Sequence, residues 1–362
     1  MNARRVVVTG LGCVGPFGLG GGPLAAALAA GSPLGEPETV ATLRGRSRRV
    51  RVARILPFDR ERHLPARTLR RMGDVSQIWT IVCLLARAEA GLDEGDAAAY
   101  PPARRGTFMG TGFGCIDSTW EYLTGMVRDP GGATSPFLFS ESVANAPAGH
   151  SAIVLDTRGA SVSLTCGDAS AAVAVRCAAV AIRSGRIDVA YCGGIEMMVD
   201  PLLRVLASLG SLSFVSEGAV CLVLEDRDRA LARGAAVLAE LSGWGLLSDP
   251  AAPPAGWSRD ASRHRAAMRR ALDGAGPTAR VYLHGPPDEA AAAAQASAAL
   301  AEAPHAERID VTSVTGDLGA AGGFPLAAAV LSPGSPGHGR GDALVCGSSW
   351  GGTLACLRLS PP

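Results

Sequence analysis

An aspartate occupies the junction between a short apolar strand and an alanine-rich helix. The junction reads Thr165-Cys166-Gly167-Asp168-Ala169-Ser170. A carboxylate at a helix N-terminus is stabilised in its charged form, by roughly 0.3–1 kcal/mol where it is exposed. Histidine and carboxylate side chains that converge with it from later turns would supply an acid and base set. The simpler interpretation, which we favour, is that Asp168 only caps the helix.

Cys166 is a second candidate nucleophile, two residues before Asp168. Alternate residues of a strand point the same way, so Cys166 should lie deeper in the sheet than Asp168. It also lacks the helix N-terminus that would lower the pKa of its thiol. We therefore predict a buried structural cysteine.

The elements that must position these residues are short apolar strands alternating with alanine-rich helices. This pattern predicts an α/β fold whose sheets are buried on both faces. Expected strands lie at 5–8, 107–109, 161–164, 189–192, 220–224, 281–283, 343–346 and 354–357. Expected helices lie at about 67–91, 168–184, 261–274 and 288–303. Pro- and Gly-rich stretches at 249–256 and 332–342 predict exposed loops.

Bulk composition excludes several classes of function. The formal net charge of +1 argues against a nucleic-acid-binding protein. The nine cysteines show no paired CxxC spacing, so neither a disulfide framework nor a metal site is expected. No apolar run approaches the roughly 20 residues of a membrane span, and the first residues do not resemble a signal peptide. These features predict a cytoplasmic protein.

One glycine motif imitates a dinucleotide site. Gly10-Leu11-Gly12-Cys13-Val14-Gly15 follows a strand, as in the fingerprint that lets a pyrophosphate approach a helix. The motif also requires a second strand ending in an acidic residue about 20 residues later, and none follows. We expect a structural turn here and no cofactor.

The longer context of Asp168 resembles the β-ketoacyl synthase family. The residues from Gly159 to Ser170 lead into the helix, and Tyr191-Cys192-Gly193-Gly194-Ile195-Glu196 follows it, in the order and spacing that this family shows. Further similar segments span nearly the whole chain: Gly110–Gly114, Asn145–His150, Ser216–Ala219 and Ser349–Thr353. The resemblance implies a thiolase-like fold of five αβαβα layers. It also implies two similar halves, which we place at residues 1–226 and 227–362, and a dimer.

The family's catalytic triad is incomplete in this sequence. The resemblance places an acyl-accepting cysteine at residue 168, where this chain has aspartate. One of the two family histidines is retained as His284, and Asp317 occupies the place of the other. A charged Asp168 would repel a malonyl carboxylate, which disfavours decarboxylation and condensation.

A scaffold without its nucleophile resembles the chain-length factors of type II polyketide synthases. These ketosynthase-like subunits pair with an active ketosynthase and help to form the tunnel that holds the growing chain. The resemblance implies a ketosynthase partner and an acyl carrier protein that carries the chain. Residues expected at the tunnel or the interface are Phe113, Phe137, Leu138, Phe139 and Trp350. Chain-length factors often carry glutamine at the nucleophile position, so aspartate indicates a divergent subclass.

Two other functions stay open at this point. The chain could be an acyl-thioester enzyme with altered chemistry that uses Asp168 and His284. It could also be an acyl-binding or scaffolding homodimer.

Overall fold

The computed structural model describes residues 4–92, 100–129, 131, 134–209, 213–274, 276–317, 323–332 and 341–362. Its largest feature is an 11-stranded sheet built from two groups of strands that follow the same plan. In the N-terminal group the order is β6-β5-β7-β9-β1, and in the C-terminal group it is β12-β11-β13-β14-β10. In both groups the first three strands are parallel and the last two are antiparallel to their neighbours. The repeated plan gives the two similar halves of a thiolase-like fold.

Eight of the ten strands in these two groups overlap the expected ranges, whereas the strands Ala239–Ser248 and Glu307–Asp310 were not expected. The N-terminal group comprises β1 (Val6–Gly15), β5 (Arg105–Gly110), β6 (Ser161–Leu164), β7 (Val189–Glu196) and β9 (Gly218–Asp226). The C-terminal group comprises β10 (Ala239–Ser248), β11 (Thr278–His284), β12 (Glu307–Asp310), β13 (Asp342–Ser348) and β14 (Thr353–Ser360). The two groups meet where Val7 and Val8 of β1 pair with Glu240 and Ala239 of β10.

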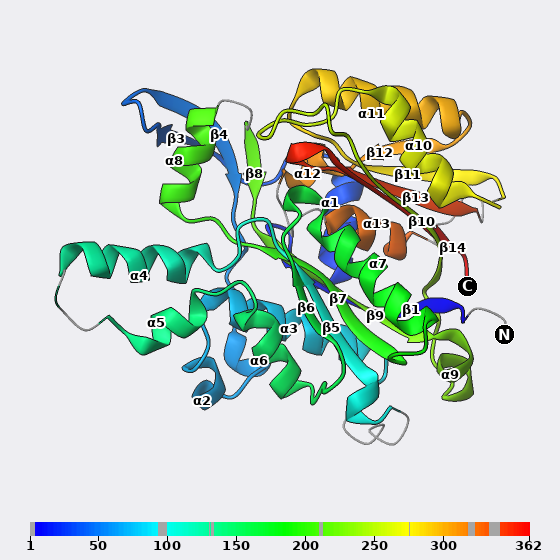
Figure 1. The fold of residues 1–362 in the computed structure, drawn as a ribbon, viewed down its shortest axis with the longest axis horizontal. Helices are drawn as coiled ribbons and strands as arrows, with labels where there is room; N and C mark the ends of the chain where they lie inside the picture. The colour runs from blue at the N-terminus through cyan, green and yellow to red at the C-terminus, as the bar shows by residue number, and fades with distance from the viewer. Residues whose placement is uncertain are drawn as a thin grey trace.

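Helices form the layers on either side of these strands (Figure 1). The inner layer holds α7 (Ser170–Arg183) and α13 (Phe324–Leu331), whose apolar side chains share one core with strands of both groups. The helix α3 (Asp74–Glu89) packs on β1, β9 and β7 beside α6 (Ala146–Val154), and forms one outer layer. The other outer layer holds α10 (Ala261–Leu272) and α11 (Glu289–Glu302). The five-layered arrangement therefore agrees with the expectation.

Smaller elements surround these layers. A separate three-stranded sheet is formed by β3 (Glu36–Ala41), β4 (Ser47–Ala53) and β8 (Phe214–Ser216), and α8 (Asp200–Leu209) packs against it. Figure 1 shows α4 (Ile116–Arg128) extending from the body of the molecule, with α5 (Pro136–Glu141) beside it. The remaining elements are β2 (Gly18–Leu19), α1 (Gly21–Ala30), α2 (Ala66–Leu69), α9 (Arg227–Ala232) and α12 (Thr312–Thr315). Within the described ranges, no helix combines the length and the apolar character needed to cross a membrane.

The glycines that resemble a dinucleotide-binding motif lie inside a strand, so the prediction of a turn at this place is wrong. β1 continues through Gly10 and Gly12 to Gly15, and only then reverses into β2. A Cβ added at Gly10 would lie 2.2 Å from the carbonyl oxygen of Ala86, and one at Gly12 would lie 2.0 Å from that of Val82. The glycines therefore allow α3 to pack directly on the strand, a role that needs no cofactor.

The helix expected at 67–91 is interrupted. The chain forms α2, turns through Arg70–Gly73 and starts again as α3. The N–H of Gly73 donates a hydrogen bond to the Glu141 carboxylate, a contact made 68 residues away in sequence. Apolar periodicity continues across such a turn, which is why the sequence alone suggested one helix.

Candidate functional site

Asp168 lies in a tight turn between β6 and α7. The turn is a short 3-10 helix, Gly167–Ala169, and the positive φ of Gly167 (56°) favours glycine. The hydroxyl of Ser170 accepts a hydrogen bond from the N–H of Cys166 at 2.8 Å. The backbone N–H of Asp168 donates to Ser349 Oγ at 3.0 Å. Asp168 is thereby held almost completely out of solvent, at 1 % exposure.

The carboxyl group of Asp168 does not cap α7, so the capping interpretation is wrong. The residue at the cap position is Ala169, and the first turn of α7 receives no side-chain cap. Instead, Oδ2 of Asp168 accepts a hydrogen bond from the indole N–H of Trp257 at 3.2 Å. The side chain is directed into the protein by partners that are distant in sequence.

Burial also reverses the expected charge state of Asp168. Desolvation, followed by the charge of Asp317, raises the pKa of this carboxyl to about 8, although His284 and Trp257 oppose the shift. The neutral acid is then the favoured form at pH 7. The helix N-terminus acts in the opposite direction, but its effect is smaller than the cost of burying a carboxylate.

His284 and Asp317 form the second part of the site. His284 is the last residue of β11, and its Nε2 lies 2.8 Å from Oδ1 of Asp317. The backbone of Asp317 is held against β8, because its N–H donates to the carbonyl of Phe214 and its own carbonyl accepts from Ser216. Burial disfavours the charged imidazole, but the adjacent Asp317 and the nearby Asp168 outweigh this effect and raise the pKa of His284.

The three residues meet as the sequence suggested they could. One ligand atom from each of Asp168, His284 and Asp317 lies within 4.8 Å of the others, and all three residues are buried. Asp317 is the residue that the family resemblance aligns with a second histidine, and the segment after it, residues 318–322, lies outside the described residues. The cluster can exchange protons, but it contains no thiolate.

Cys166 does not supply that thiolate. It is partly exposed, so the prediction of a buried cysteine is wrong. It lies on the turn after β6 rather than within the strand, which gives it access to solvent on one side. Burial, and then the neighbouring Cys177, raise the pKa of its thiol, so the unreactive protonated form is favoured.

Three aromatic rings form a connected group beside the buried aspartate, and Trp257 is the one that bonds to it. The Phe113 and Trp350 ring centroids are 5.3 Å apart, and those of Trp257 and Trp350 are 6.1 Å apart. Phe113 and Trp350 were candidates from the sequence, whereas Trp257 was missed. It follows a Pro-rich stretch expected to be an exposed loop, yet it is only 3 % exposed. A large aromatic residue beside such a stretch is the only local sign that the loop folds back.

Glu196 is a further buried residue that sequence analysis did not select as a site. It ends β7 and accepts hydrogen bonds from the backbone N–H groups of Gly112 and Phe113. Burial is the main cause that raises its pKa to about 8, and the charge of Asp168 adds to it. The Gly-Gly-Ile-Glu motif contained this residue, but only the fold brings it near the turn of Asp168.

Phe137, Leu138 and Phe139 lie on α5. Phe137 is 40 % exposed and Phe139 is 59 % exposed. The ring centroid of Phe139 lies 5.7 Å from that of Tyr122 on α4. Leu138 lines a cavity of about 330 Å³ between α4 and α5. These three residues are thus grouped with α4 at the surface of the single chain.

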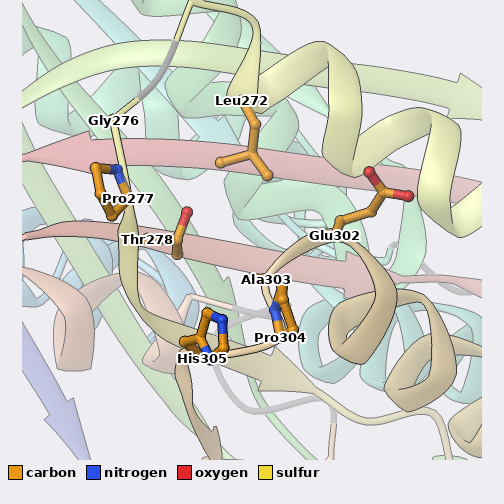
Figure 2. A pocket seen from close by; sticks show the side chains of 8 residues that line it. All are labelled: Leu272, Gly276, Pro277, Thr278, Glu302, Ala303, Pro304 and His305. Atoms are coloured by element: carbon orange, nitrogen blue, oxygen red, sulfur yellow. The ribbon is translucent and has the colours of Figure 1, made fainter.

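A separate cavity of about 280 Å³ lies between the ends of α10 and α11 and the start of β11 (Figure 2). Its lining includes Leu272, Thr278, Glu302 and His305. Arg265 and Arg269 already pair with the Glu302 carboxylate. The residues that line it belong to the outer layer of the C-terminal half.

Comparison with known proteins places this geometry in a family. The profile described as "Beta-ketoacyl synthase, N-terminal domain" matches residues 3–241. The 3-oxoacyl-[acyl-carrier-protein] synthase 2 of Vibrio cholerae is 28 % identical over 92 % of this chain and 86 % of its own length. The structure of the ishigamide ketosynthase/chain length factor superposes with a TM-score of 0.83 at 24 % identity, covering 99 % of this chain and 100 % of the other. A type II polyketide acyl-carrier protein in complex with its ketosynthase superposes with a TM-score of 0.77 at 21 % identity, again over 99 % and 100 %. The chain belongs to the β-ketoacyl synthase family.

Proposed function

We propose that this chain is a non-catalytic, ketosynthase-like subunit that pairs with an active ketosynthase and shapes the acyl tunnel of a type II polyketide synthase. The observation that carries the proposal is the environment of Asp168. At the family's nucleophile position stands a buried carboxyl whose pKa is raised to about 8. Acyl transfer to the enzyme requires an activated nucleophile, and a protonated carboxyl in an apolar site is a poor one.

The remainder of the site also argues against condensation by this chain. Asp317 stands where the family has its second histidine, 2.8 Å from His284. The histidines stabilise the developing enolate as hydrogen-bond donors, whereas a carboxylate would repel it. Both the nucleophile and half of the enolate site are therefore missing.

The strand β6 offers a surface for a partner. It ends the order of the large sheet and pairs with β5 on one side. Its residues Val162 and Leu164 are only partly buried in the single chain. An apolar edge strand is a template for pairing with a second chain, and the fold family's dimeric assemblies make a ketosynthase the expected partner.

The helix α4 carries a second apolar surface. Trp120, Leu123 and Met126 follow at helical spacing and are 50 %, 51 % and 46 % exposed. The exposed Phe137 and Phe139 of α5 lie beside this helix. Contiguous exposed apolar side chains are typical of a surface that another protein covers.

The named structural relatives support this partner. One is a ketosynthase/chain length factor, and another holds an acyl-carrier protein with its ketosynthase bound to a hexaketide. An acyl carrier protein is accordingly the expected carrier of the chain. Phe113 and Trp350, whose rings pack together and connect through Trp257 to the buried Asp168, are the residues we expect to limit the tunnel.

The decisive experiment is co-expression with an active type II polyketide ketosynthase, followed by size-exclusion chromatography with mass detection. A one-to-one heterodimer is expected. In that complex, Asp168→Asn should leave polyketide formation intact, whereas alanine at the partner's nucleophilic cysteine should abolish it. A homodimer that ignores the ketosynthase, or loss of product with Asp168→Asn, would contradict the proposal.

A second function is favoured by the convergence of Asp168, His284 and Asp317 within 4.8 Å. Such a set could act as acid and base on a carrier-bound acyl thioester. The test is thioester hydrolysis by the purified chain alone. Turnover that is lost with Asp168→Asn but kept with Cys166→Ala would establish this activity in place of the first.

A further inference from the structure

The cluster of Asp168, His284 and Asp317 has the composition of a metal site. Their exposed fractions are 1 %, 2 % and 5 %, and one ligand atom from each lies within 4.8 Å of the others. We propose that this cluster binds one divalent transition-metal ion of the zinc type. The inference goes beyond the proposed function, because a partner subunit needs no ion.

Charge balance supports a dication at this place. Two carboxyl groups and one imidazole are enclosed together in the protein interior. Two carboxylates this close repel each other when both are ionised, and burial increases the penalty. With a divalent ion between them, two carboxylates and a neutral imidazole give a site of zero net charge.

A second observation comes from the unused oxygen of Asp168. Oδ2 accepts the hydrogen bond from Trp257, but among the described residues no donor reaches Oδ1, which is buried. Buried carboxylate oxygens are almost always satisfied, and an ion is one of the partners that satisfies them. Oδ1 thus has lone pairs for which the described residues supply no donor.

The spacing of the ligand atoms suits such an ion after a small adjustment. Zinc binds imidazole nitrogen and carboxylate oxygen at about 2.0–2.2 Å, which sets tetrahedral ligand atoms roughly 3.3 Å apart. His284 Nε2 and Asp317 Oδ1 are 2.8 Å apart, and Asp168 lies within the 4.8 Å limit. To bind the ion, His284 and Asp317 would move apart by roughly 0.5 Å and Asp168 would approach by up to about 1.5 Å, and a fourth position stays open for water.

The donor set also indicates the class of metal. Imidazole with carboxylates suits zinc and manganese, whereas thiolate-rich sites select softer ions. The cluster contains no sulfur ligand. No metal site was expected from the sequence, because these ligands come from three distant segments rather than from paired cysteines.

The test uses the purified full chain, stripped with chelator and then titrated with Zn²⁺ against a competing chromophoric chelator. We expect one ion per chain. At Zn²⁺ about 100-fold above Kd the Tm should rise by about 3 °C. Asp168→Asn and His284→Gln should each weaken binding by more than about 100-fold, since even outer residues of such sites contribute 10–100-fold.

A matched control and a spectroscopic probe separate this site from the nine free cysteines. Asp249→Asn changes another buried aspartate, one bonded to Ser258 and Ala251, and should leave binding unchanged. Co²⁺ in the site should give visible bands of nitrogen and oxygen ligation without thiolate charge transfer.

The proposal is overturned if the wild-type chain binds no ion, if the bound Co²⁺ shows thiolate ligation, or if both variants bind as tightly as the wild type. Should Asp168→Asn fail to fold, His284→Gln and the wild-type spectrum still decide.

Discussion

The indole N–H of Trp257 donates to Oδ2 of Asp168 across 3.2 Å, joining two residues 89 positions apart. Trp257 is buried, and its ring contacts Trp350, which in turn contacts Phe113. The Asp168 side chain is therefore fixed by an aromatic group that lies 89 positions later in the chain. This contact makes the altered site a structured part of the protein interior.

Trp257→Phe should destabilise the protein by about 1–3 kcal/mol, because a buried carboxyl oxygen then loses its donor. Urea unfolding at pH 7 measures the change. Trp120→Phe is the matched control, since Trp120 is 50 % exposed on α4 and its replacement should stay within about 0.5 kcal/mol. Equal effects for the two variants would show that the hydrogen bond to Asp168 does not contribute.

Glu196→Gln should remove a pH dependence of stability. The pKa of Glu196 is about 8 in the folded chain against 4.5 in the unfolded one, so its contribution is fully present below pH 4.5 and is lost as pH rises through 8. The variant should therefore gain stability relative to the wild type between pH 5 and pH 9, on the order of a few kcal/mol. Unfolding free energies across this range give the difference. The exposed Glu36→Gln serves as the control substitution. A difference between Glu196→Gln and the wild type that does not change with pH would refute the expectation.

Gly167→Ala should disrupt the turn that holds Asp168. The φ of Gly167 is 56°, and an added Cβ would lie 2.2 Å from Ser349 Oγ. The left-handed conformation alone costs about 1–2 kcal/mol for a residue with a Cβ, and the clash adds to it. Gly149→Ala in α6 meets nothing within 4 Å and should instead stabilise by about 0.5–1 kcal/mol. Thermal unfolding compares the two, and a Gly167→Ala variant as stable as the wild type would contradict the turn as described.

Leu123→Ser should weaken assembly with the proposed ketosynthase partner. Leu123 is 51 % exposed on α4, and covering such a side chain contributes about 1.5–3 kcal/mol, or at least about tenfold in Kd. Leu300→Ser is matched in exposure at 52 % but lies on α11, on the opposite side of the molecule (Figure 1). Binding measured by surface plasmon resonance should distinguish them. If both variants bind the partner equally, α4 does not belong to the interface.

Much of the layered fold could be predicted from local patterns. Each expected strand overlaps an observed one, because short apolar runs buried on both faces are recognisable without tertiary knowledge, whereas β10 and β12 were not predicted. The helices α4, α5 and α8 were not predicted, since they are short or cover surfaces that only the assembled fold defines. Gly10 and Gly12 were assigned to a turn, because the close packing of α3 on their strand is a long-range contact.

The sequence by itself determined that residue 168 is an aspartate, residue 284 a histidine and residue 317 an aspartate, and the family resemblance made these three positions candidates for the site. The tertiary structure alone decided the state of these groups. Asp168 was expected to be a charged helix cap, but burial, Asp317, His284 and Trp257 act on it together and favour the neutral acid. A pKa depends on desolvation and on charges within a few ångströms, and both come from segments that the linear chain keeps more than 80 residues apart.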